Sequence, residues 1–331
     1  MDVFSDLVRG VRSHGSLFGV SVLRPPWDLR FDGGAPLTLC ALLSGAARVV
    51  PQDGPPEPVA AGETVVVRGP APFRLTSEPA ADVDPVPWRP GRAEPGSAPP
   101  GASTLVVGAY PARGEIGRRL LDALPPVLRV GGGESGDVED PVLDHLAAEV
   151  AVEAPGQQAV LDRLLDWLLV CTLRTWFDRP GGRPPRWWSA QRDPVVGEAL
   201  RLLHTDPAAP WTVASLAART GVSRSTLAER FTDRVGEPPV TYLTRWRMTL
   251  AADLLLERPE ATVAQVARRV GYADPFAFSA AFRRVRGTSP SGFRRAVEGP
   301  ADAGDPRAPG APQRGWTSAM GPNPSTSAAS T

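Results

Sequence analysis

The chain has 331 residues, a formal net charge of zero at pH 7, 38 Pro, 33 Gly and only two Cys. This length suffices for two domains with full hydrophobic cores, and two cysteines exclude a disulfide framework and a zinc-thiolate cluster. The polar N-terminus lacks the apolar core of a signal peptide, and the longest apolar run, Trp167 to Leu173, is too short for a bilayer span, so we expect a soluble cytoplasmic protein.

A short helix and a series of strands are predicted for the N-terminal part of the chain. Apolar residues at helical spacing predict an amphipathic helix over Asp2–Arg12. Short apolar segments follow, separated by clusters of Gly, Pro and Asp that are typical of hairpin turns. The predicted strands are Leu17–Leu23, Leu37–Leu43, Ala47–Val50, Thr64–Arg68, Phe73–Thr76 and Thr104–Ala109. This pattern indicates a small barrel or sandwich.

The segment Pro58–Val67 places a Gly62-Glu63 turn directly before a strand. Together with Ser16–Val22 and Gly108–Tyr110, it resembles the turn-and-strand pattern of cupin barrels. More narrowly, this strand-rich part is similar to the cupin-type sensor domains that are fused to many AraC-like regulators. The resemblance implies a β-barrel that senses a signal.

The histidine content argues against the enzymatic branch of the cupins. Cupin enzymes hold a metal ion with clustered His and a Glu, because these ligands must converge on one ion. This chain has three histidines, His14, His145 and His204, none of them paired at ligand spacing, and we interpret each as a surface or capping residue. We therefore expect no metal site, no cofactor and no enzymatic activity. A cupin-type metalloenzyme with a helical accessory domain is the alternative.

Other catalytic patterns are missing as well. The sequence has no Gly-x-Ser-x-Gly elbow, no phosphate-cradling Gly-rich loop and no His-Glu-x-x-His motif, so no catalytic residue is predicted. Gly131–Gly133 precedes an acidic stretch that disfavours phosphate, and we interpret it as a hinge. Cys40 and Cys171 lie in apolar segments and are interpreted as buried thiols, with redox sensing as the alternative.

A Pro-rich loop and two helices follow the strands. The loop is Glu78–Ser103, in which Trp88 is either a packed anchor or a lid over a ligand. The helices are Val138–Val152 and Gln157–Phe177, and both have broad apolar faces. These faces either pack on the barrel or form a subunit interface. Next, the Pro, Gly and Arg in Asp178–Arg192 predict a linker between domains.

The stretch Trp211–Arg295 contains the same pattern twice, with a period of roughly fifty residues. The matching positions are Thr212-Val213-Ala214 with Thr262-Val263-Ala264, Ala217 with Ala267, Gly221 with Gly271, Phe231 with Phe282, Gly236 with Gly287, Pro239 with Pro290 and Tyr242 with Phe293. An internal repeat of this kind indicates two copies of one supersecondary unit.

Each copy has the sequence pattern of a helix-turn-helix. Thr212 and Thr262 are candidate N-caps, because a hydroxyl accepts a hydrogen bond from an unpaired amide of the first turn. Gly221 stands where the first helix must end, and Ser223 is positioned to cap the second. The second helix of such a motif lies in the major groove of DNA. A helical hairpin without function has the same spacing, but two copies in register favour the DNA-binding interpretation.

The segment between the copies predicts one uninterrupted helix. Val240–Glu257 has apolar residues at helical spacing and contains neither Gly nor Pro. Such a helix measures about 27 Å, so two recognition helices could lie about 34 Å apart, one turn of B-DNA.

These features together resemble the AraC/XylS family of transcriptional regulators. The resemblance covers Asp193 to Arg295 and is specific in two stretches, Gly236–Met248 and Val270–Phe282. It implies a bacterial regulator whose C-terminal domain binds promoter DNA through both motifs.

The resemblance also implies which residues contact DNA. In the first recognition helix these are Ser223, Arg224, Ser225, Ala228 and Glu229, with Arg224 near a phosphate. In the second they are Asp274, Pro275, Phe276, Ser279, Ala280 and Arg283. Ala280 departs from the Arg that members often carry there. Since Ala and Pro offer no hydrogen bond to a base edge, the second motif is predicted to contribute shape fit and phosphate contacts through Arg283, Arg284 and Arg286.

The charge is distributed unevenly although it sums to zero. From Gln191 to Val297 the chain has sixteen Arg against ten Asp and Glu, a net charge of +6, which leaves −6 for the remainder. A basic segment joined to an acidic one is expected when only one half of a protein binds phosphate.

We therefore predict an α+β multidomain protein, with an N-terminal cupin-like β-barrel plus a helical pair and a C-terminal all-α double helix-turn-helix domain. The predicted boundaries are 1–136 for the barrel, 137–177 for the helical pair, 178–192 for the linker, 193–297 for the helix-turn-helix domain and 298–331 for a disordered tail. The predicted function is sequence-specific binding of double-stranded promoter DNA. An unknown small-molecule effector, RNA polymerase and a second copy of the chain are further expected partners, whereas no membrane contact is expected.

Overall fold

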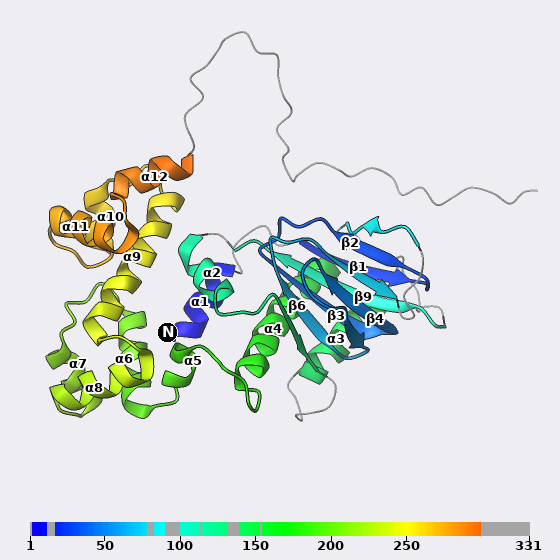
Figure 1. Cartoon of the computed structure of the whole chain (residues 1–331), viewed down its shortest axis with the longest axis horizontal. Coiled ribbons are helices and arrows are strands. Elements are labelled where there is room, and N and C mark those ends of the chain that lie inside the picture. The colour runs from blue at the N-terminus through cyan, green and yellow to red at the C-terminus, as the bar shows by residue number, and fades with distance from the viewer. Residues whose placement is uncertain are drawn as a thin grey trace, which may run out of the picture.

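A computed structural model of the protein describes residues 2–11, 17–77, 83–89, 100–112, 114–131, 139–152 and 154–298. The strands and the helices Glu139–Ala151 and Gln157–Asp178 fill one half of the molecule, and the helices after them fill the other (Figure 1). Two short helices, Val3–Val11 and Gly114–Leu121, lie between the two halves. The predicted tail therefore lies outside the described residues, apart from its first residue, and so do His14 and most of the loop Glu78–Ser103.

Within the described residues, ten strands form two five-stranded sheets. The first has the order β1-β9-β3-β6-β10 and is antiparallel throughout, whereas the second has the order β5-β4-β7-β2-β8, with β2 and β8 parallel. The strands are β1 (Leu17–Leu23), β2 (Asp28–Phe31), β3 (Leu37–Ser44), β4 (Ala46–Pro51), β5 (Glu57–Ala60), β6 (Thr64–Arg68), β7 (Phe73–Ser77), β8 (Val86–Pro87), β9 (Ser103–Tyr110) and β10 (Val127–Val130). All six predicted strands are present. Strands β2, β5, β8 and β10, which have four residues or fewer, were not predicted from the sequence.

The two sheets face each other across an apolar core. Leu42, Val65 and Leu105 of the first sheet pack with Val49 and Leu75 of the second. At one end of this core the ring of Phe31 stacks between Phe73 and Trp88, with centroid distances of 4.4 and 5.4 Å. Trp88 is thus packed against the barrel, as the anchor interpretation predicted. The structure confirms the cupin-like barrel, and its own side chains occupy the interior.

The predicted helical pair covers the outer face of the first sheet. Helices α3 (Glu139–Ala151) and α4 (Gln157–Asp178) pack side by side, and leucines of both share one core with β3, β6 and β9. The hydroxyl of Tyr110, on β9, donates a 2.9 Å hydrogen bond to the carbonyl of Leu165. Most of the apolar stripe of α4 is therefore buried within the chain, whereas Val160 and Trp167 each stay 45% exposed.

Eight helices follow α4 in the part of the chain that the structure describes. They are α5 (Arg186–Ala190), α6 (Pro194–Thr205), α7 (Val213–Thr220), α8 (Arg224–Val235), α9 (Pro239–Glu257), α10 (Val263–Arg269), α11 (Pro275–Arg286) and α12 (Pro290–Glu298). Helix α9 runs from the α7–α8 pair to the α10–α11 pair (Figure 1). No described helix is long and apolar enough to cross a bilayer.

The predicted linker contains α5 and is fastened by aromatic packing. Trp187 lies edge-on to Phe177 at 5.6 Å, and Trp188 lies edge-on to Phe4 at 5.1 Å. Phe4 belongs to α1 (Val3–Val11), whose apolar side chains are buried in the same core. The N-terminus, the linker and the end of α4 therefore meet in one cluster.

Asp193 connects the start of α6 to α8. Its carboxylate accepts hydrogen bonds from the amides of Val195 and Val196, both at 3.0 Å, and pairs with Arg230 at 2.7 Å. Burial raises the pKa of Asp193, but the amide and guanidinium bonds outweigh it and hold the pKa below its usual value.

We expect Asp193→Ala to lower the free energy of unfolding by about 1–3 kcal/mol, because it removes a helix cap and a charged partner together. The pKa is lowered, so this contribution is present above about pH 4 and is lost as the pH falls through the folded-state value. Urea denaturation at pH 7 and pH 3 measures it. Asp233→Ala is the control, since its side chain is 80% exposed and its pairing with Arg234 is weak. Equal losses in both variants would contradict this role.

Candidate nucleic-acid interface

The first helix-turn-helix, α7 and α8, is closed by side-chain caps at both helix starts. The hydroxyl of Thr212 accepts a bond from the amide of Ser215 at 3.0 Å, and the Ser215 hydroxyl accepts one from the Thr212 amide at 2.9 Å. Helix α7 ends at Gly221, whose φ of 70° is a left-handed conformation that favours glycine. Ser223 then caps α8 by accepting from the amide of Thr226 at 3.1 Å. The predicted caps are therefore confirmed.

One face of α8 is buried and the other is open. Leu227 and Phe231 are fully buried against α7 and α9, and the Phe231 ring lies edge-on to Tyr242 at 5.8 Å. Four predicted contact residues of this motif are exposed and one, Ala228, is half-buried. The exposed four are Ser223, Arg224, Ser225 and Glu229. The hydrophobic period of α8 thus turns its polar side chains outward.

The second helix-turn-helix, α10 and α11, repeats this construction. Thr262 and Gln265 form the same reciprocal cap. Phe278 and Phe282 are buried, whereas Phe276 is 85% exposed. The two carboxylate oxygens of Asp274 accept from the amides of Phe276 and Ala277, both at 3.0 Å, so Asp274 caps α11. A large aromatic ring is therefore presented to solvent at the first turn of the second recognition helix.

The remaining predicted residues of α11 divide into two groups. Ala280, Arg283 and Arg284 are exposed, whereas Pro275 and Ser279 are half-buried, and the Ser279 hydroxyl donates to the carbonyl of Pro275 at 2.8 Å.

One predicted phosphate contact is wrong. The guanidinium of Arg286 is turned into an interface, where its Nη1 pairs with Glu115 at 2.5 Å and its Nη2 donates to Thr249 at 3.3 Å.

Helix α9 joins the two motifs as one rigid body. Trp246 is buried in the core of the first motif, and Met248 and Leu255 are buried in the core of the second. The Arg247 guanidinium donates to the carbonyls of Pro207 and Ala209, both at 2.7 Å, which pins the loop before α7. The 19 residues of α9 give a length of about 28 Å. The separation of the recognition helices is therefore set by a continuous hydrogen-bonded rod.

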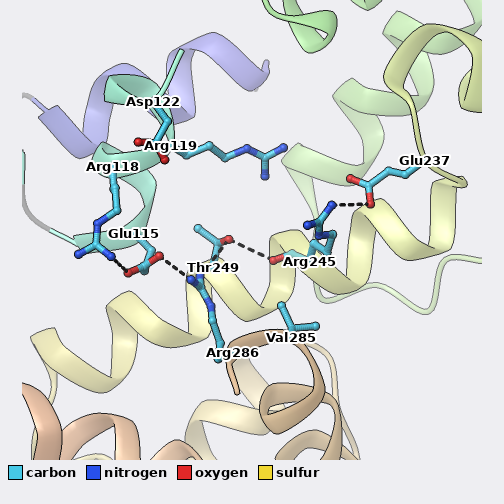
Figure 2. Close-up of a pocket in the computed structure, with 9 residues that line it drawn as sticks. All are labelled: Glu115, Arg118, Arg119, Asp122, Glu237, Arg245, Thr249, Val285 and Arg286. Carbon is cyan, nitrogen blue, oxygen red and sulfur yellow. Dashed lines mark hydrogen bonds and ion pairs between the residues drawn. The ribbon is translucent and has the colours of Figure 1, made fainter. Parts of the chain in front are cut away.

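One helix of the N-terminal half docks on this rod, a contact that was not predicted from the sequence. The carboxylate of Asp253, on α9, accepts from the amides of Glu115 and Ile116 at 2.5 and 3.1 Å, at the start of α2 (Gly114–Leu121). Glu115 in turn pairs with Arg286 of α11, as Figure 2 shows. Helix α2 thus contacts α9 and the second recognition helix at once.

Burial raises the pKa of Asp253 to about 6, although the two amide bonds favour the charged form. A carboxyl whose pKa rises on docking binds its proton more tightly in the docked state. Asp253 therefore favours the docked state most at low pH, where its carboxyl is protonated, and this stabilisation is lost as the pH rises through about 6.

A second contact ties α1 to the same region through His204. The Nδ1 of His204 lies 2.7 Å from a carboxylate oxygen of Asp6, and its Nε2 lies 2.7 Å from the hydroxyl of Tyr242. Burial lowers the pKa of His204, and Asp6 offsets this only in part. A neutral ring with its proton on Nδ1 donates to Asp6 and accepts from the Tyr242 hydroxyl. Interpreting His204 as a surface or capping residue was therefore wrong. It is buried between α1, α6 and α9.

His145 is exposed, with Nδ1 2.6 Å from the carbonyl of Pro141. Within the described residues, no group of three His, Cys, Asp or Glu is arranged to hold a metal ion. Cys40 and Cys171 are both buried, and burial raises the pKa of the Cys40 thiol well above its usual value.

Both halves of the chain match known families. Residues 2–178 match the model described as Cupin, and residues 216–296 match the model described as Helix-turn-helix domain. A protein of Streptomyces antibioticus described as an AraC-like transcription regulator is 34% identical over 305 residues, which cover 89% of this chain and 99% of that protein. The HTH-type transcriptional regulator AlkR of Acinetobacter baylyi is 33% identical over 183 residues, covering 54% of this chain and 59% of that protein.

Among solved structures, the DNA-binding domain of AdpA in complex with a target DNA is 33% identical. The alignment covers 32% of this chain and 94% of that one, with a TM-score of 0.31.

We expect Gly114→Ala to release α2 from α9. A Cβ on Gly114 would clash with the Asp253 carboxylate, whereas nothing lies within 4 Å of a Cβ on Gly181. Gly181→Ala is the matched control, because φ is 76° at Gly114 and 70° at Gly181, and each substitution carries about 1 kcal/mol of backbone strain.

Hydrogen exchange measures the release. Amide exchange at Glu115 and Ile116 should accelerate about tenfold or more in Gly114→Ala, because these amides donate to Asp253. It should not change in Gly181→Ala. Unchanged exchange in both variants would rule out the docked arrangement in solution.

Proposed function

Because this chain belongs to the AraC-like transcription regulators, we propose that it regulates transcription by binding promoter DNA in two successive major grooves. The observation that supports this most is the pair of capped helix-turn-helix units on one rigid connector. A recognition helix enters the major groove with its N-terminal residues toward the bases, and successive grooves lie about 34 Å apart on one side of B-DNA. The polar face of α8 and the exposed start of α11 fit this mode of binding.

The two motifs would discriminate between bases in different ways. In α8, Glu229 is exposed and can accept a hydrogen bond from the amino group of a cytosine. In α11 the exposed Phe276 and Ala280 offer only apolar contact, which suits the methyl group of thymine. The exposed Arg283 and Arg284 would hold phosphates beside this second half-site. Strict sequence demands across the second half-site would therefore contradict the proposal.

The N-terminal half would act as the regulatory part. Its α1 and α2 contact both the α6–α9 core and α11, so a change in the barrel half can reach both DNA-reading units. A non-catalytic role is supported by the barrel interior, where the buried residues of both sheets form one apolar cluster. RNA polymerase would be the partner that converts promoter occupancy into transcription.

We expect Glu229→Ala and Arg224→Ala to differ in kind. Removing a base contact changes which base is preferred at one or two positions, whereas removing a phosphate contact weakens all sites alike and lowers the salt slope by about one. Selection of bound sequences from random duplexes, followed by titration at several salt concentrations, measures both effects. Arg174→Ala, an exposed arginine of α4, is the charge-matched control and should bind like the wild type. Identical behaviour of the first two variants would refute this assignment of roles.

We also propose that α4 forms a homodimer interface. Val160, Leu164 and Trp167 lie at i, i+4 and i+7, and so they share one face of the helix. Val160 and Trp167 are each 45% exposed.

Trp167→Arg should shift the protein from dimer to monomer in equilibrium sedimentation at micromolar concentration. Val86→Arg, at an exposed apolar residue of the barrel strand β8, should leave the dimer intact. A wild-type chain that sediments as a monomer would count against the interface.

A further inference from the structure

A cavity of about 370 Å³ lies where α2 meets the DNA-binding helices. Four arginines line it from three elements, with Arg118 and Arg119 on α2, Arg245 on α9 and Arg286 on α11 (Figure 2). The volume is within the range of small-molecule sites, which begins at about 300 Å³. The helix-turn-helix pattern assigns this cavity no role in DNA binding.

The positive charge around this cavity is only partly compensated. Glu115 serves two guanidinium groups, pairing with Arg118 at 2.8 Å and with Arg286 at 2.5 Å. Arg245 pairs with Glu237 at 3.3 Å. Among the described residues, one further carboxylate, that of Asp122, lines the cavity, so four cations face three anions.

Arg119 stands out within this cluster. Among the described residues no carboxylate pairs with it, and its guanidinium lies over the rings of Tyr242 and Trp246, with centroid distances of 5.4 and 5.9 Å. In addition, the Nε of Arg286 is buried without a hydrogen-bond partner among the described residues. A guanidinium is a fixed fork of donors that suits carboxylate and phosphate groups. The cavity therefore has donors and positive charge in excess of its acceptors.

We propose that this cavity binds a small organic anion carrying a carboxylate or phosphate group, which Arg119 and Arg245 hold from opposite sides of the α2–α9 interface. The alternative location is the barrel, but apolar side chains fill its interior. The cavity beside Phe31 and Trp88 measures only about 200 Å³. A second cavity at the edge of the barrel measures about 400 Å³, but among the described residues its two arginines, Arg68 and Arg118, face two carboxylates, Asp53 and Asp122, so it has no excess of positive charge.

Binding here would act on both halves of the protein. The anion neutralises arginines that face each other across the interface, so it favours the arrangement in which α2 is docked on α9. This coupling to DNA rests on the proposed function, whereas anion binding itself does not. If the anion changes the affinity for duplex DNA by some factor, DNA changes the affinity for the anion by the same factor.

The test is calorimetric titration of the full chain with citrate and, separately, with inorganic phosphate at constant ionic strength. The two probes distinguish a carboxylate ligand from a phosphate ligand. We expect at least one probe to bind at millimolar concentration or below, and Arg119→Gln to weaken it about tenfold or more, because one charge-assisted hydrogen bond is lost.

The control Arg30→Gln removes one arginine from an exposed ion pair with Asp32 on the barrel, and should bind like the wild type. Arg245→Gln removes a different guanidinium from the cavity. If Arg119→Gln unfolds, the anion affinity of Arg245→Gln tests the proposal in its place. Binding of neither probe, or equal binding by the wild type and both cavity variants, would overturn the proposal.

A gel shift with promoter duplex separates the two proposals. Anion binding without duplex binding would refute the proposed function and leave the cavity assigned. Duplex binding without binding of either probe would overturn the cavity proposal and leave the proposed function standing. Anion binding that leaves the duplex affinity unchanged would overturn the coupling.

Discussion

Helix α9 is the element on which the arrangement of the C-terminal half depends, because it contributes to two hydrophobic cores in succession. Trp246 belongs to the core of the first helix-turn-helix, and Met248, Ala252 and Leu255 belong to the core of the second. A continuous helix has fixed rise and rotation per residue, so the cores fix the phase between the two motifs as well as their distance. A flexible linker in place of α9 would not fix this phase and distance, since each recognition helix would then have to find its groove independently.

Helix α9 also contacts the N-terminal half of the chain through polar side chains. Asp253 caps α2, and His204 and Tyr242 meet Asp6 of α1. A buried carboxylate loses much of its hydration, which is why the pKa of Asp253 rises to about 6. Desolvation offsets a large part of the attraction in such polar contacts, and apolar side chains of α1 and α2 that share one core with Tyr242 and Trp246 add to the docking.

The two helix-turn-helix units share a scaffold but differ on their open faces. In α8 the exposed positions are polar or charged, whereas α11 begins with an exposed Phe276 and continues with Ala280. Base recognition through hydrogen bonds and through apolar contact differs in specificity, because only the first distinguishes all four base pairs in the major groove. The scaffold positions, by contrast, match between the copies, since the caps Thr212 and Thr262 and the buried Phe231 and Phe282 serve the same packing.

The sequence by itself determined most of the features that depend on neighbours along the chain. Helix caps such as Ser223, the uninterrupted α9 and the longer strands follow from hydrogen bonds and side-chain periods that are local, and they are present where they were predicted. Strands β2, β5, β8 and β10 were not predicted, and each has four residues or fewer.

Only the tertiary structure decided the contacts between the two halves. Asp253 lies 138 residues from Glu115, and His204 lies 198 residues from Asp6. Nothing local distinguishes these residues from ordinary polar ones. For the same reason Arg286, which has the sequence pattern of a phosphate contact, is an interface residue instead. The packing of the chain determines which residue pairs with Arg286, and the spacing of residues in the sequence does not predict that partner.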